Sequence, residues 1–446
     1  MQFAFLCKTV KGQEFMVRSN LGFCIAATIA SVTCLTSAMA ETLVPALGAK
    51  SAGRGGTNFA FSDNGFVLHD NPAGLLGATG CDCGKTSDLL EISGAMLFPS
   101  LLYSDPQNMG VSASNDPFAL GALTIAHRVN EDVAVGFGVY TPAGFGARWT
   151  MDGPPGPLSG PQFYKSIGML IRFLPGISVQ ATERLRVGGT LGLAASHVEL
   201  EGPYFINSAP LTGTPTLIDV QATGAAVTWS TGLQYDVSDS LILGARYQSQ
   251  NRFKNDGNAR VSIPGLGTSA YDMTLDIVWP RSLGGGLQYK LTESRRLGLD
   301  LEWQQWSHAV NRLDFNFTNP TNPVFQQVAG PSLKDSIPLA WGDTVVVKSG
   351  IEQDIGSDKT VRLGYSYNND AVRSGTMTTY IPTILSHYFT AGFGLKKSGW
   401  EYDAAYQYSF RPTLHVGTSD LAGGDFSSSS FNTTAHWMFL SATRKF

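Results

Sequence analysis

The most regular feature of the chain is an alternation of apolar and polar residues that recurs from residue 88 to the C-terminus. Between Trp400 and Phe410 every even position is apolar or aromatic, whereas the odd positions are polar apart from one alanine. Because successive side chains of a strand point to opposite faces, this period of two predicts a strand with one apolar and one polar face. The same alternation recurs at 297–304 and 361–368. The chain is therefore predicted to be all-β.

Turn spacing orders these strands into pairs. Short polar turns recur along the chain, and between successive short turns lies a pair of strands joined by a longer loop. The short turns are at 130–132, 182–184, 238–239, 292–294, 356–358 and 397–399. The fourteen strands are predicted at 88–104, 116–129, 132–141, 163–180, 185–200, 223–236, 240–254, 271–291, 295–316, 343–355, 359–370, 386–396, 399–415 and 431–446. An even number of strands with alternating short turns and long loops is the pattern of bacterial outer-membrane barrels.

Two architectures use a strand with one apolar face. In a soluble sandwich that face covers a core, and such a protein would be a secreted or periplasmic adhesin or structural module. In a membrane barrel the same face meets lipid, with aromatic residues near the interfaces. A sandwich has no reason to alternate short and long loops, so the loop pattern favours a fourteen-stranded antiparallel transmembrane β-barrel. Several strands exceed the roughly 9–11 residues that a tilted span needs, which predicts a barrel projecting beyond the bilayer.

The N-terminus carries the features of a secretory leader. Lys8, Lys11 and Arg18 precede an apolar run at 21–35, and small residues end at Ala40. This predicts a signal peptide over residues 1–40, removed after Ala40. Met16 also begins a leader of ordinary length, so residues 1–15 are an alternative upstream start.

Residues 47–76 separate the leader from the strands and fit neither a strand nor a regular helix. Six glycines allow tight turns there, while residues such as Phe59, Phe61 and Phe66 need a buried environment. We expect residues 41–87 to form a compact hatch, that is, an irregular plug folded inside the lumen of a barrel formed by residues 88–446. A barrel of this strand number is wide enough to need such a filler.

Composition excludes several functions. Removal of residues 1–40 leaves 28 basic residues (31 less three) and 34 acidic residues (35 less one), a net charge of -6 without a basic cluster. That charge argues against a nucleic-acid partner.

Cysteine and histidine patterns limit the chemistry further. Of five cysteines only Cys81 and Cys83 remain, either as a strained disulfide or as two isolated thiols. The histidines lack metal-ligand spacing, and no cofactor fingerprint or hydrolase motif occurs, so no metal, cofactor or catalytic residue is expected. A barrel lipase with a triad on adjacent strands is the remaining enzymatic alternative.

The tripeptide Asn71-Pro72-Ala73, followed by Gly74-Leu75, resembles the hatch motif of the FadL family when it is taken with the strands that follow and with the terminal Phe446. The same tripeptide also occurs in ordinary Asx-Pro turns. The family comprises outer-membrane channels for long-chain fatty acids and, in its TodX-like branch, aromatic hydrocarbons. The resemblance implies a non-enzymatic, monomeric transport protein of the Gram-negative outer membrane, in contact with lipid and lipopolysaccharide.

Two further features match that family. Phe446 resembles the C-terminal address read by the barrel-assembly machinery, although Arg444 departs from the usual aromatic or apolar residue two positions before the end.

The third predicted strand leads into a cluster of glycine and proline that includes Pro142 and Gly144. Proline donates no ladder hydrogen bond and glycine packs nothing, so pairing to a neighbour should be weak there. The resemblance implies a lateral opening at Pro142 and Gly144, with Asn71, Pro72 and Ala73 as the hatch gate. A simple bend of the barrel wall is the alternative.

Apolar residues cluster in two predicted loops that should otherwise be polar. They are Phe145, Trp149 and Met151 after the third strand, and Tyr204, Phe205, Ile206 and Leu217 after the fifth. Such grouping predicts a capture groove for a hydrophobic molecule. The alternative is a lid in which the loops pack on one another, and the two are compatible.

Alternation also places charged residues of both signs inside the lumen. They are Arg246, Asp300, Glu302, Lys348, Glu352, Arg362, Glu401 and Asp403. Buried charges should pair with each other or with the hatch backbone. A fatty acid would need a cationic partner for its carboxylate, and Arg246 and Lys348 are the candidates. On strand five, His197 and Glu199 have outward parity and would need a bulge to face inward. We expect passive uptake of long-chain fatty acids, with hydrocarbons as the alternative.

Overall fold

The computed structural model describes residues 46–80, 87–114 and 116–446. Its strands form one antiparallel sheet. They are β1 (Asp88–Ser104), β2 (Val111–Ser112), β3 (Phe118–Arg128), β4 (Val133–Asp152), β5 (Pro161–Thr182), β6 (Leu185–Phe205), β7 (Pro215–Ser238), β8 (Leu241–Gln248), β9 (Asn251–Ile263), β10 (Gly267–Trp279), β11 (Ser282–Thr292), β12 (Arg295–Gln304), β13 (Arg312–Thr318), β14 (Ser332–Pro338), β15 (Thr344–Ile355), β16 (Lys359–Asn368), β17 (His387–Lys397), β18 (Trp400–Val416) and β19 (Ser429–Lys445).

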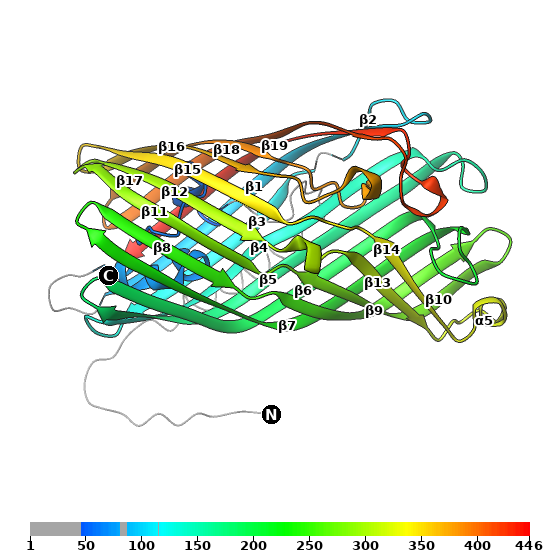
Figure 1. Cartoon of the computed structure of the whole chain (residues 1–446), viewed down its shortest axis with the longest axis horizontal. Helices are drawn as coiled ribbons and strands as arrows, with labels where there is room; N and C mark the ends of the chain where they lie inside the picture. The colour runs from blue at the N-terminus through cyan, green and yellow to red at the C-terminus, as the bar shows by residue number, and fades with distance from the viewer. Residues whose placement is uncertain (1–45, 81–86, 115) are drawn as a thin grey trace, which may run out of the picture. The chain divides into compact units, whose positions relative to one another are not determined.

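The sheet closes on itself because β1 pairs with β19 from Leu89↔Lys445 to Ser104↔Ser430. In the described residues these nineteen strands make fourteen wall strands, since four wall strands are each divided in two and β2 is a separate two-residue strand. The divided wall strands are β8 with β9, β10 with β11, β12 with β13, and β14 with β15. The predicted fourteen-stranded antiparallel barrel is therefore confirmed, and its steeply inclined strands are seen in Figure 1.

The four divisions fall on neighbouring strands. The chain leaves the ladder at 249–250, 280–281, 305–311 and 339–343, so the breaks cross the wall together. On one side of this line the outward residues are apolar, as with Leu283 and Leu301, which are more than half exposed. Beyond it the outward residues include Arg252, Lys254, Asp272 and Asp276. The change from apolar to charged places the outer edge of the lipid-facing band close to this line.

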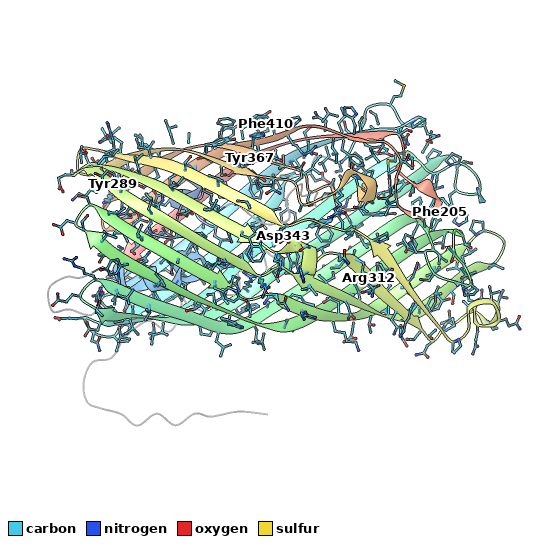
Figure 2. All side chains as sticks on the ribbon, in the orientation of Figure 1. Phe205, Tyr289, Arg312, Asp343, Tyr367 and Phe410 are labelled. Carbon is cyan, nitrogen blue, oxygen red and sulfur yellow. The ribbon has the colours of Figure 1, made fainter. Side chains whose placement is uncertain are left out.

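The lipid-facing band is apolar on its outer surface and carries aromatic side chains. Figure 2 shows Tyr289 toward the end of the barrel that holds the C-terminus, Tyr367 and Phe410 on the outer surface, and Phe205 toward the other end. The side chains of Tyr289, Tyr367 and a further outward aromatic residue, Phe389, are each more than a third exposed. None of the helices in the described residues is both long enough and apolar enough to cross a membrane.

Several predicted strand ends were wrong. The third strand was predicted to end at Thr141, but β4 continues to Asp152, because β5 supplies ladder partners as far as Pro161. Likewise β6 extends to Phe205 and β7 begins at Pro215, so most of the loop predicted after the fifth strand is a paired ribbon. Three of the four divided strands were predicted as continuous, at 240–254, 271–291 and 295–316, because alternation on either side of a short break looks the same in sequence. Of the fourth, only β15 was predicted, at 343–355, and β14 lies in what was predicted as a loop.

The segment before the wall is irregular and compact. Its elements are α2 (Ala49–Gly53), α3 (Val67–Asp70), η1 (Pro72–Gly74) and α4 (Leu75–Ala78), each a single turn or little more. Almost every residue from 46 to 80 is buried, although none of these elements could be stable alone. The hatch is held by the surrounding strands. The predicted leader, Met16 and the Cys81–Cys83 pair lie outside the described residues.

The remaining helices lie in the connections between strands, and the first of them fills part of the break between β12 and β13. They are η2 (Trp306–His308), α5 (Pro323–Ala329), η3 (Ser374–Thr376) and η4 (Ala422–Gly424). Beyond the line of breaks, β14 pairs with β13, and no further partner strand is found for it in the described residues. Buried side chains of the segment 372–385, including Met377 and Ile381, pack in this outer part of the barrel.

Candidate functional site

The hatch backbone lies directly against glycines of the wall. Gly298 pairs with Gly350, and Gly350 pairs with Gly364, so three glycines form a row across β12, β15 and β16. A β-carbon at Gly350 would lie 2.1 Å from the carbonyl oxygen of Arg54, and one at Gly364 would lie 2.0 Å from the backbone nitrogen of Gly55. Real β-carbons do not approach backbone atoms so closely, so these positions require glycine.

This glycine row is part of a wider belt. Ten neighbouring wall strands each contribute one glycine whose β-carbon would meet a hatch atom at 3.0 Å or less. The belt consists of Gly136 (β4), Gly176 (β5), Gly188 (β6), Gly232 (β7), Gly244 (β8), Gly284 (β11), Gly298 (β12), Gly350 (β15), Gly364 (β16) and Gly392 (β17). Five of these glycines meet backbone atoms of the hatch and five meet its side chains, so the hatch lies directly against the wall at every one of these strands.

Ion pairs reinforce this fit. The guanidinium of Arg54, fully buried, contacts Asp63 at 2.9 Å and Glu352 of β15 at 3.5 Å. Arg296 of β12 bridges the same two carboxylates, and its Nη2 lies 2.8 Å from Asp63 Oδ2. Arg362 pairs with Glu352 and, at 2.7 Å, with Asp403. These charges lie at short distance with alternating sign, so each compensates another.

The other predicted lumen charges also have partners. Lys50 Nζ lies 2.7 Å from Glu401 Oε2, and Asp300 Oδ2 accepts hydrogen bonds from the backbone of Asn58 at 2.7 Å and Phe59 at 3.1 Å. Arg246 and Lys348 contact the same carboxylate, Glu302, at 3.4 Å and 3.9 Å. The expectation that lumen charges pair with each other or with the hatch is confirmed.

The motif Asn71-Pro72-Ala73 is entirely buried where the hatch meets β6 and β7. Asn71 Nδ2 donates to the carbonyl oxygens of Phe59 at 2.6 Å and Leu233 at 3.0 Å, and its Oδ1 accepts from Ala73 N at 3.3 Å. Proline at the first position of η1 has no N–H that would need a partner. The motif thus joins two parts of the hatch to one wall strand through a single side chain.

A cavity of about 130 Å³ lies on the outer side of the hatch. Its wall includes the hatch residues Phe59, His69 and Asp70 and both predicted cations, Arg246 and Lys348. Pro142, predicted at the lateral opening, also lines it. The structure therefore brings together Arg246 and Lys348, predicted to bind substrate, with Pro142, predicted at the lateral opening. Within the described residues no three His, Cys, Asp or Glu side chains are grouped as metal ligands.

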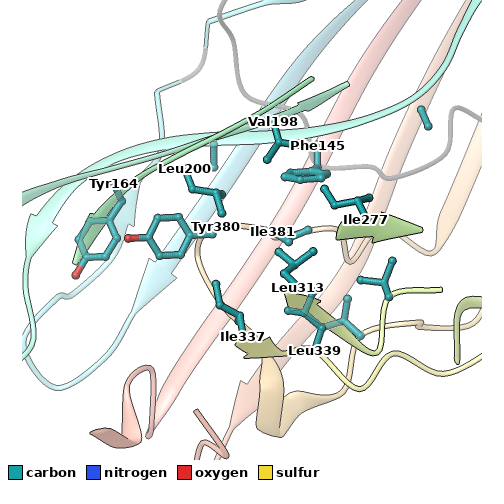
Figure 3. Close-up of a cluster of buried hydrophobic side chains, with 14 of the residues drawn as sticks. Phe145, Tyr164, Val198, Leu200, Ile277, Leu313, Ile337, Leu339, Tyr380 and Ile381 are labelled. Atoms are coloured by element: carbon teal, nitrogen blue, oxygen red, sulfur yellow. The ribbon is translucent and has the colours of Figure 1, made fainter. Parts of the chain in front are cut away.

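The space beyond this cavity is filled by apolar side chains. Phe145, Trp149 and Ile206 are 6%, 2% and 2% exposed and belong to one large buried cluster. Figure 3 shows Phe145 in this cluster beside Val198, with Tyr380 reaching toward Tyr164. The rings of Tyr164 and Tyr380 are 5.7 Å apart. The cluster is closely packed, which agrees with the lid interpretation.

The other predicted capture residues lie at different places. Tyr204 and Phe205 line a small cavity of about 30 Å³ with Tyr380 and Phe426, and the Tyr204 hydroxyl donates to Asp335 Oδ2 at 2.7 Å. Leu217 has the outward parity of β7, because Thr216 and Ile218 are the buried residues on either side. Leu217 does not join the cluster, since what was predicted as a loop is a strand.

Residues Tyr140 to Ala147 form the most irregular part of the wall. All eight are buried, so this part of β4 has no lipid-exposed face. Pairing of β4 with β3 ends at Tyr140↔Ala122, and the register of β4 against β5 shifts by one residue between Tyr140 and Ala143. The shift contains Pro142, which can donate no ladder hydrogen bond. The chain therefore turns away from β3 where glycine and proline predicted weak pairing.

Sequence reasoning missed Arg172. It lies on the inward face of β5 between the buried Leu170 and Leu174 and lines the cavity. A single charged residue at an inward position of an otherwise apolar strand was the available signal. His197 and Glu199 have outward parity, as predicted, because the alternate residues Val198 and Leu200 are buried and no register shift occurs nearby.

The geometry agrees with comparisons to known proteins. The sequence matches the family described as "Outer membrane protein transport protein (OMPP1/FadL/TodX)" over residues 29–446. A comparison with curated protein sequences gave no match.

Solved structures with a similar fold include the toluene transporter TodX of Pseudomonas putida, with 17% identity, a TM-score of 0.73 and coverage of 90% of this chain and 99% of that one. A FadL homologue of Pseudomonas aeruginosa has 16% identity, a TM-score of 0.68 and coverage of 91% and 99%. The toluene transporter TbuX of Ralstonia pickettii has 17% identity, a TM-score of 0.69 and coverage of 90% and 99%. The family match spans nearly the whole chain and the barrel fold is shared, so this chain belongs to the OMPP1/FadL/TodX family of outer-membrane channels for hydrophobic compounds.

Proposed function

We propose that this protein mediates passive uptake of hydrophobic small molecules by surface capture, hatch gating and lateral release into the bilayer. The single observation that carries this proposal is the buried run Tyr140–Ala147, where β4 leaves β3. A strand that loses its neighbour next to an internal cavity supplies a route from the lumen to the side of the barrel. Pro142, which lines the cavity and lies at the register shift, joins the two ends of that route.

Capture is assigned to the apolar cluster that contains Phe145, Trp149 and Ile206, together with the smaller cavity at Tyr204 and Phe205. An apolar ligand that enters between these side chains leaves water for a hydrophobic environment, at roughly 25 cal/mol for each Å² of apolar surface buried. No energy source is needed for such a step, because transfer into the membrane is downhill for a hydrophobic compound.

The gate is assigned to Asn71, Pro72 and Ala73. The glycine belt and the buried ion pairs tie the hatch to the wall at many points, so removal of the entire hatch would break all of these contacts. A local shift of the motif breaks only the bonds of one side chain to Phe59, Leu233 and Ala73. Gating by local rearrangement is therefore the less costly course.

Long-chain fatty acids are the first substrate class that we propose, on the breadth of the OMPP1/FadL/TodX family alone, since Arg246 and Lys348 of the cavity both contact Glu302. Hydrocarbons are the second. The apolar side chains of Phe59, Trp306 and Leu385 also line the cavity of about 130 Å³ and would contact an uncharged ligand. An acyl chain would have to extend from this cavity into the apolar cluster.

Uptake of a labelled fatty acid and a labelled alkylbenzene by a transporter-deficient host distinguishes these classes. Expression of the protein should raise the rate for at least one of them, and heat-modifiable migration in detergent gels serves as the control for folding. An assembled barrel that raises neither rate would contradict the proposed transport. In the membrane we propose a monomer in contact with lipopolysaccharide, delivered through its C-terminal strand by the barrel-assembly machinery.

A further inference from the structure

A third cavity, at the outer end of the barrel, has an acidic lining without a basic partner. Its volume is about 80 Å³, and it lies between the loop after β1, the turn from β4 to β5 and the loop that contains η4. Asp105, Asp152 and Asp425 line it, and no lysine, arginine or histidine among the described residues does. Since one buried water needs roughly 10–15 Å³ of such space, the cavity has room for a group of several heavy atoms.

Two of these acids lack a counter-charge. The hydrogen bonds to Asp105 come from neutral groups, among them Tyr103 Oη at 2.7 Å and Asn108 N at 2.6 Å, and Asp425 Oδ1 accepts from Phe426 N at 3.1 Å. Neither carboxylate forms an ion pair with a basic side chain in the described part of the chain. Burial raises the pKa of Asp425 to about 7, and the charge of Asp105 acts in the same direction. A cation bound between them would compensate both charges.

The same cavity contains a buried hydroxyl without a partner. Tyr164 is 2% exposed and lines the cavity, and its hydroxyl forms no hydrogen bond to any described residue. Figure 3 shows this hydroxyl directed away from Tyr380 and the apolar cluster. Buried polar groups nearly always have a hydrogen-bond partner, so the hydroxyl of Tyr164 points to a polar ligand in the cavity.

Aromatic rings complete the lining. Tyr103 and Phe426 line the cavity with their ring centroids 6.2 Å apart and their planes at 82°. The faces of such rings attract ammonium groups. Among the residues that the structure describes, no three His, Cys, Asp or Glu side chains are grouped as metal ligands, so the lining suits an organic cation better than a metal ion.

An apolar cavity adjoins the acidic one. The cavity of about 30 Å³ beside Tyr204 and Phe205 shares Asp425 and Phe426 with it. Its wall also includes Ile337, which belongs with Phe426 to the large buried cluster. A molecule with a cationic head in the acidic cavity would therefore direct an apolar tail past Phe426 toward the cluster. Because the apolar cavity is too small for a whole chain, the tail would displace side chains of the cluster.

We propose that these two cavities bind a hydrophobic primary amine, with its ammonium group between Asp105 and Asp425 and its apolar tail beside Phe426. The ammonium group would donate charge-assisted hydrogen bonds to the carboxylate of Asp425 and to the hydroxyl oxygen of Tyr164. This inference rests on the proposed function, and it adds amphiphilic amines to the substrate classes of the same capture site.

The test measures binding to the purified full-length protein with probes that share a ten-carbon chain. Decylamine is a cation with hydrogens to donate, decyltrimethylammonium is a cation without them, decanol is neutral and decanoate is an anion. At pH 8 the amine, with a pKa of about 10.4, is protonated, and Asp425 is above its own pKa. The variants are Asp425→Asn and Tyr164→Phe. Asp420→Asn is the matched control, because Asp420 is exposed in the same loop and lines neither cavity.

Asp425→Asn should weaken binding of decylamine by roughly tenfold or more, since it removes the charged partner, and should leave binding of decanol unchanged. Tyr164→Phe should weaken binding of decylamine severalfold but not that of decyltrimethylammonium, which cannot donate a hydrogen bond. Asp420→Asn should have no effect. The wild-type protein should bind decylamine more tightly than decanoate. Heat-modifiable migration reports assembly of each barrel.

Two kinds of result would overturn the proposal. Equal affinity of the wild-type protein for decylamine and decanol, or equal weakening of both by Asp425→Asn, would exclude an ammonium site. Displacement of decylamine by calcium, without any effect of Tyr164→Phe, would assign the cavity to an inorganic cation. Uptake by a transporter-deficient host is measured separately. If decylamine binds but no hydrophobic probe enters through the wild-type protein, the ammonium site stands and the proposed transport fails.

If Asp425→Asn does not assemble, competition in the wild-type protein gives the answer. Excess butylamine should displace decylamine, whereas butanol at the same concentration should not. Equal displacement by the amine and the alcohol would contradict an ammonium site at Asp425.

Discussion

The carbonyl oxygen of Arg54 lies so close to Gly350 that a β-carbon on residue 350 would stand 2.1 Å from it. The hatch and the wall thus touch through backbone atoms, which cannot rotate away as a side chain can. The fit of the hatch depends on the absence of a methyl group at this and the neighbouring belt positions. Close packing of this kind fixes the position of the hatch in the lumen, and the polar side chains of the hatch still form their hydrogen bonds and ion pairs.

Replacement of Gly350 by alanine should therefore destabilise the hatch. Insertion of a methyl group into closely packed structure costs about 1–3 kcal/mol, and contact with the backbone of Arg54 places this site toward the upper end. Thermal unfolding followed by heat-modifiable migration would measure the loss. Gly285→Ala is the matched control, because a β-carbon there would lie 3.7 Å from its nearest neighbour, the carbonyl oxygen of Gly244. Equal stability of the two variants would mean that the belt does not hold the hatch.

Replacement of Asn71 by alanine should reduce transport while leaving the barrel assembled. The change removes two donated hydrogen bonds and one accepted bond, and it leaves the carbonyl of Leu233 without this partner, a cost of about 1–3 kcal/mol. The wall ladder does not depend on this side chain. Uptake and heat-modifiable migration should be measured together, with Asn130→Ala as the control, because Asn130 caps an exposed turn by accepting from Asp132 N. Normal uptake by a protein that assembles poorly would instead assign the motif a bracing role.

The wall was predictable from sequence because strand alternation is a local property. Trp400–Val416 and Asp88–Ser104 were placed within a residue. Burial alternates along all of β1, and along most of β18 before the register shift that follows Arg411. The position of Pro142 at a weak point of pairing followed from the chemistry of proline alone. Features that follow from the backbone of one strand can therefore be derived without knowledge of its neighbours.

Features that depend on neighbours could not be derived in this way. The continuation of β4 to Asp152 results from partners on β5, and the Gly-Pro cluster hid it by interrupting the alternation. The glycine belt depends on which glycines meet the hatch, and single glycines are common in barrel strands. Arg246 and Lys348 were expected to meet a substrate carboxylate, but both contact Glu302. The partners of Arg172, which are Asn251 and His69, lie on other segments and could not be read from its own strand.

Deletion of Pro142 should close the lateral opening that we propose. Tyr140 pairs with Arg172 and Ala143 with Leu170, so β4 has one residue more than β5 across this interval. Removal of Pro142 makes the two strands equal in length and allows β4 to run straight and pair with β3. Uptake of every hydrophobic probe should then fall while the barrel still assembles. Pro142→Ala, which keeps the extra residue, is the control and should retain most of the uptake. Normal uptake by the deletion variant would show that substrate leaves the barrel elsewhere.

The loop that follows η4 should loosen as pH rises. Burial raises the pKa of Asp425 to about 7, with the nearby charge of Asp105 acting in the same direction, while a hydrogen bond from Phe426 N opposes it. The ordinary value is 3.8, so between about pH 4 and pH 7 the folded loop binds a proton that an unfolded loop does not. The stability of the loop is therefore greatest below this window and falls as pH rises through it.

Hydrogen exchange of residues 417–428 at pH 5.5 and pH 8.5, corrected for the intrinsic pH dependence of exchange, would measure this effect. Protection should be greater at the lower pH, and Asp425→Asn should remove the difference because its amide is neutral at both values. Asp420→Asn is the matched control, since Asp420 is an exposed residue of the same loop. Asp425 lines the small cavity that also contains Tyr204 and Phe205, so a looser loop at high pH should also widen the capture site. Protection that is independent of pH in the wild-type protein would contradict a buried, protonated Asp425.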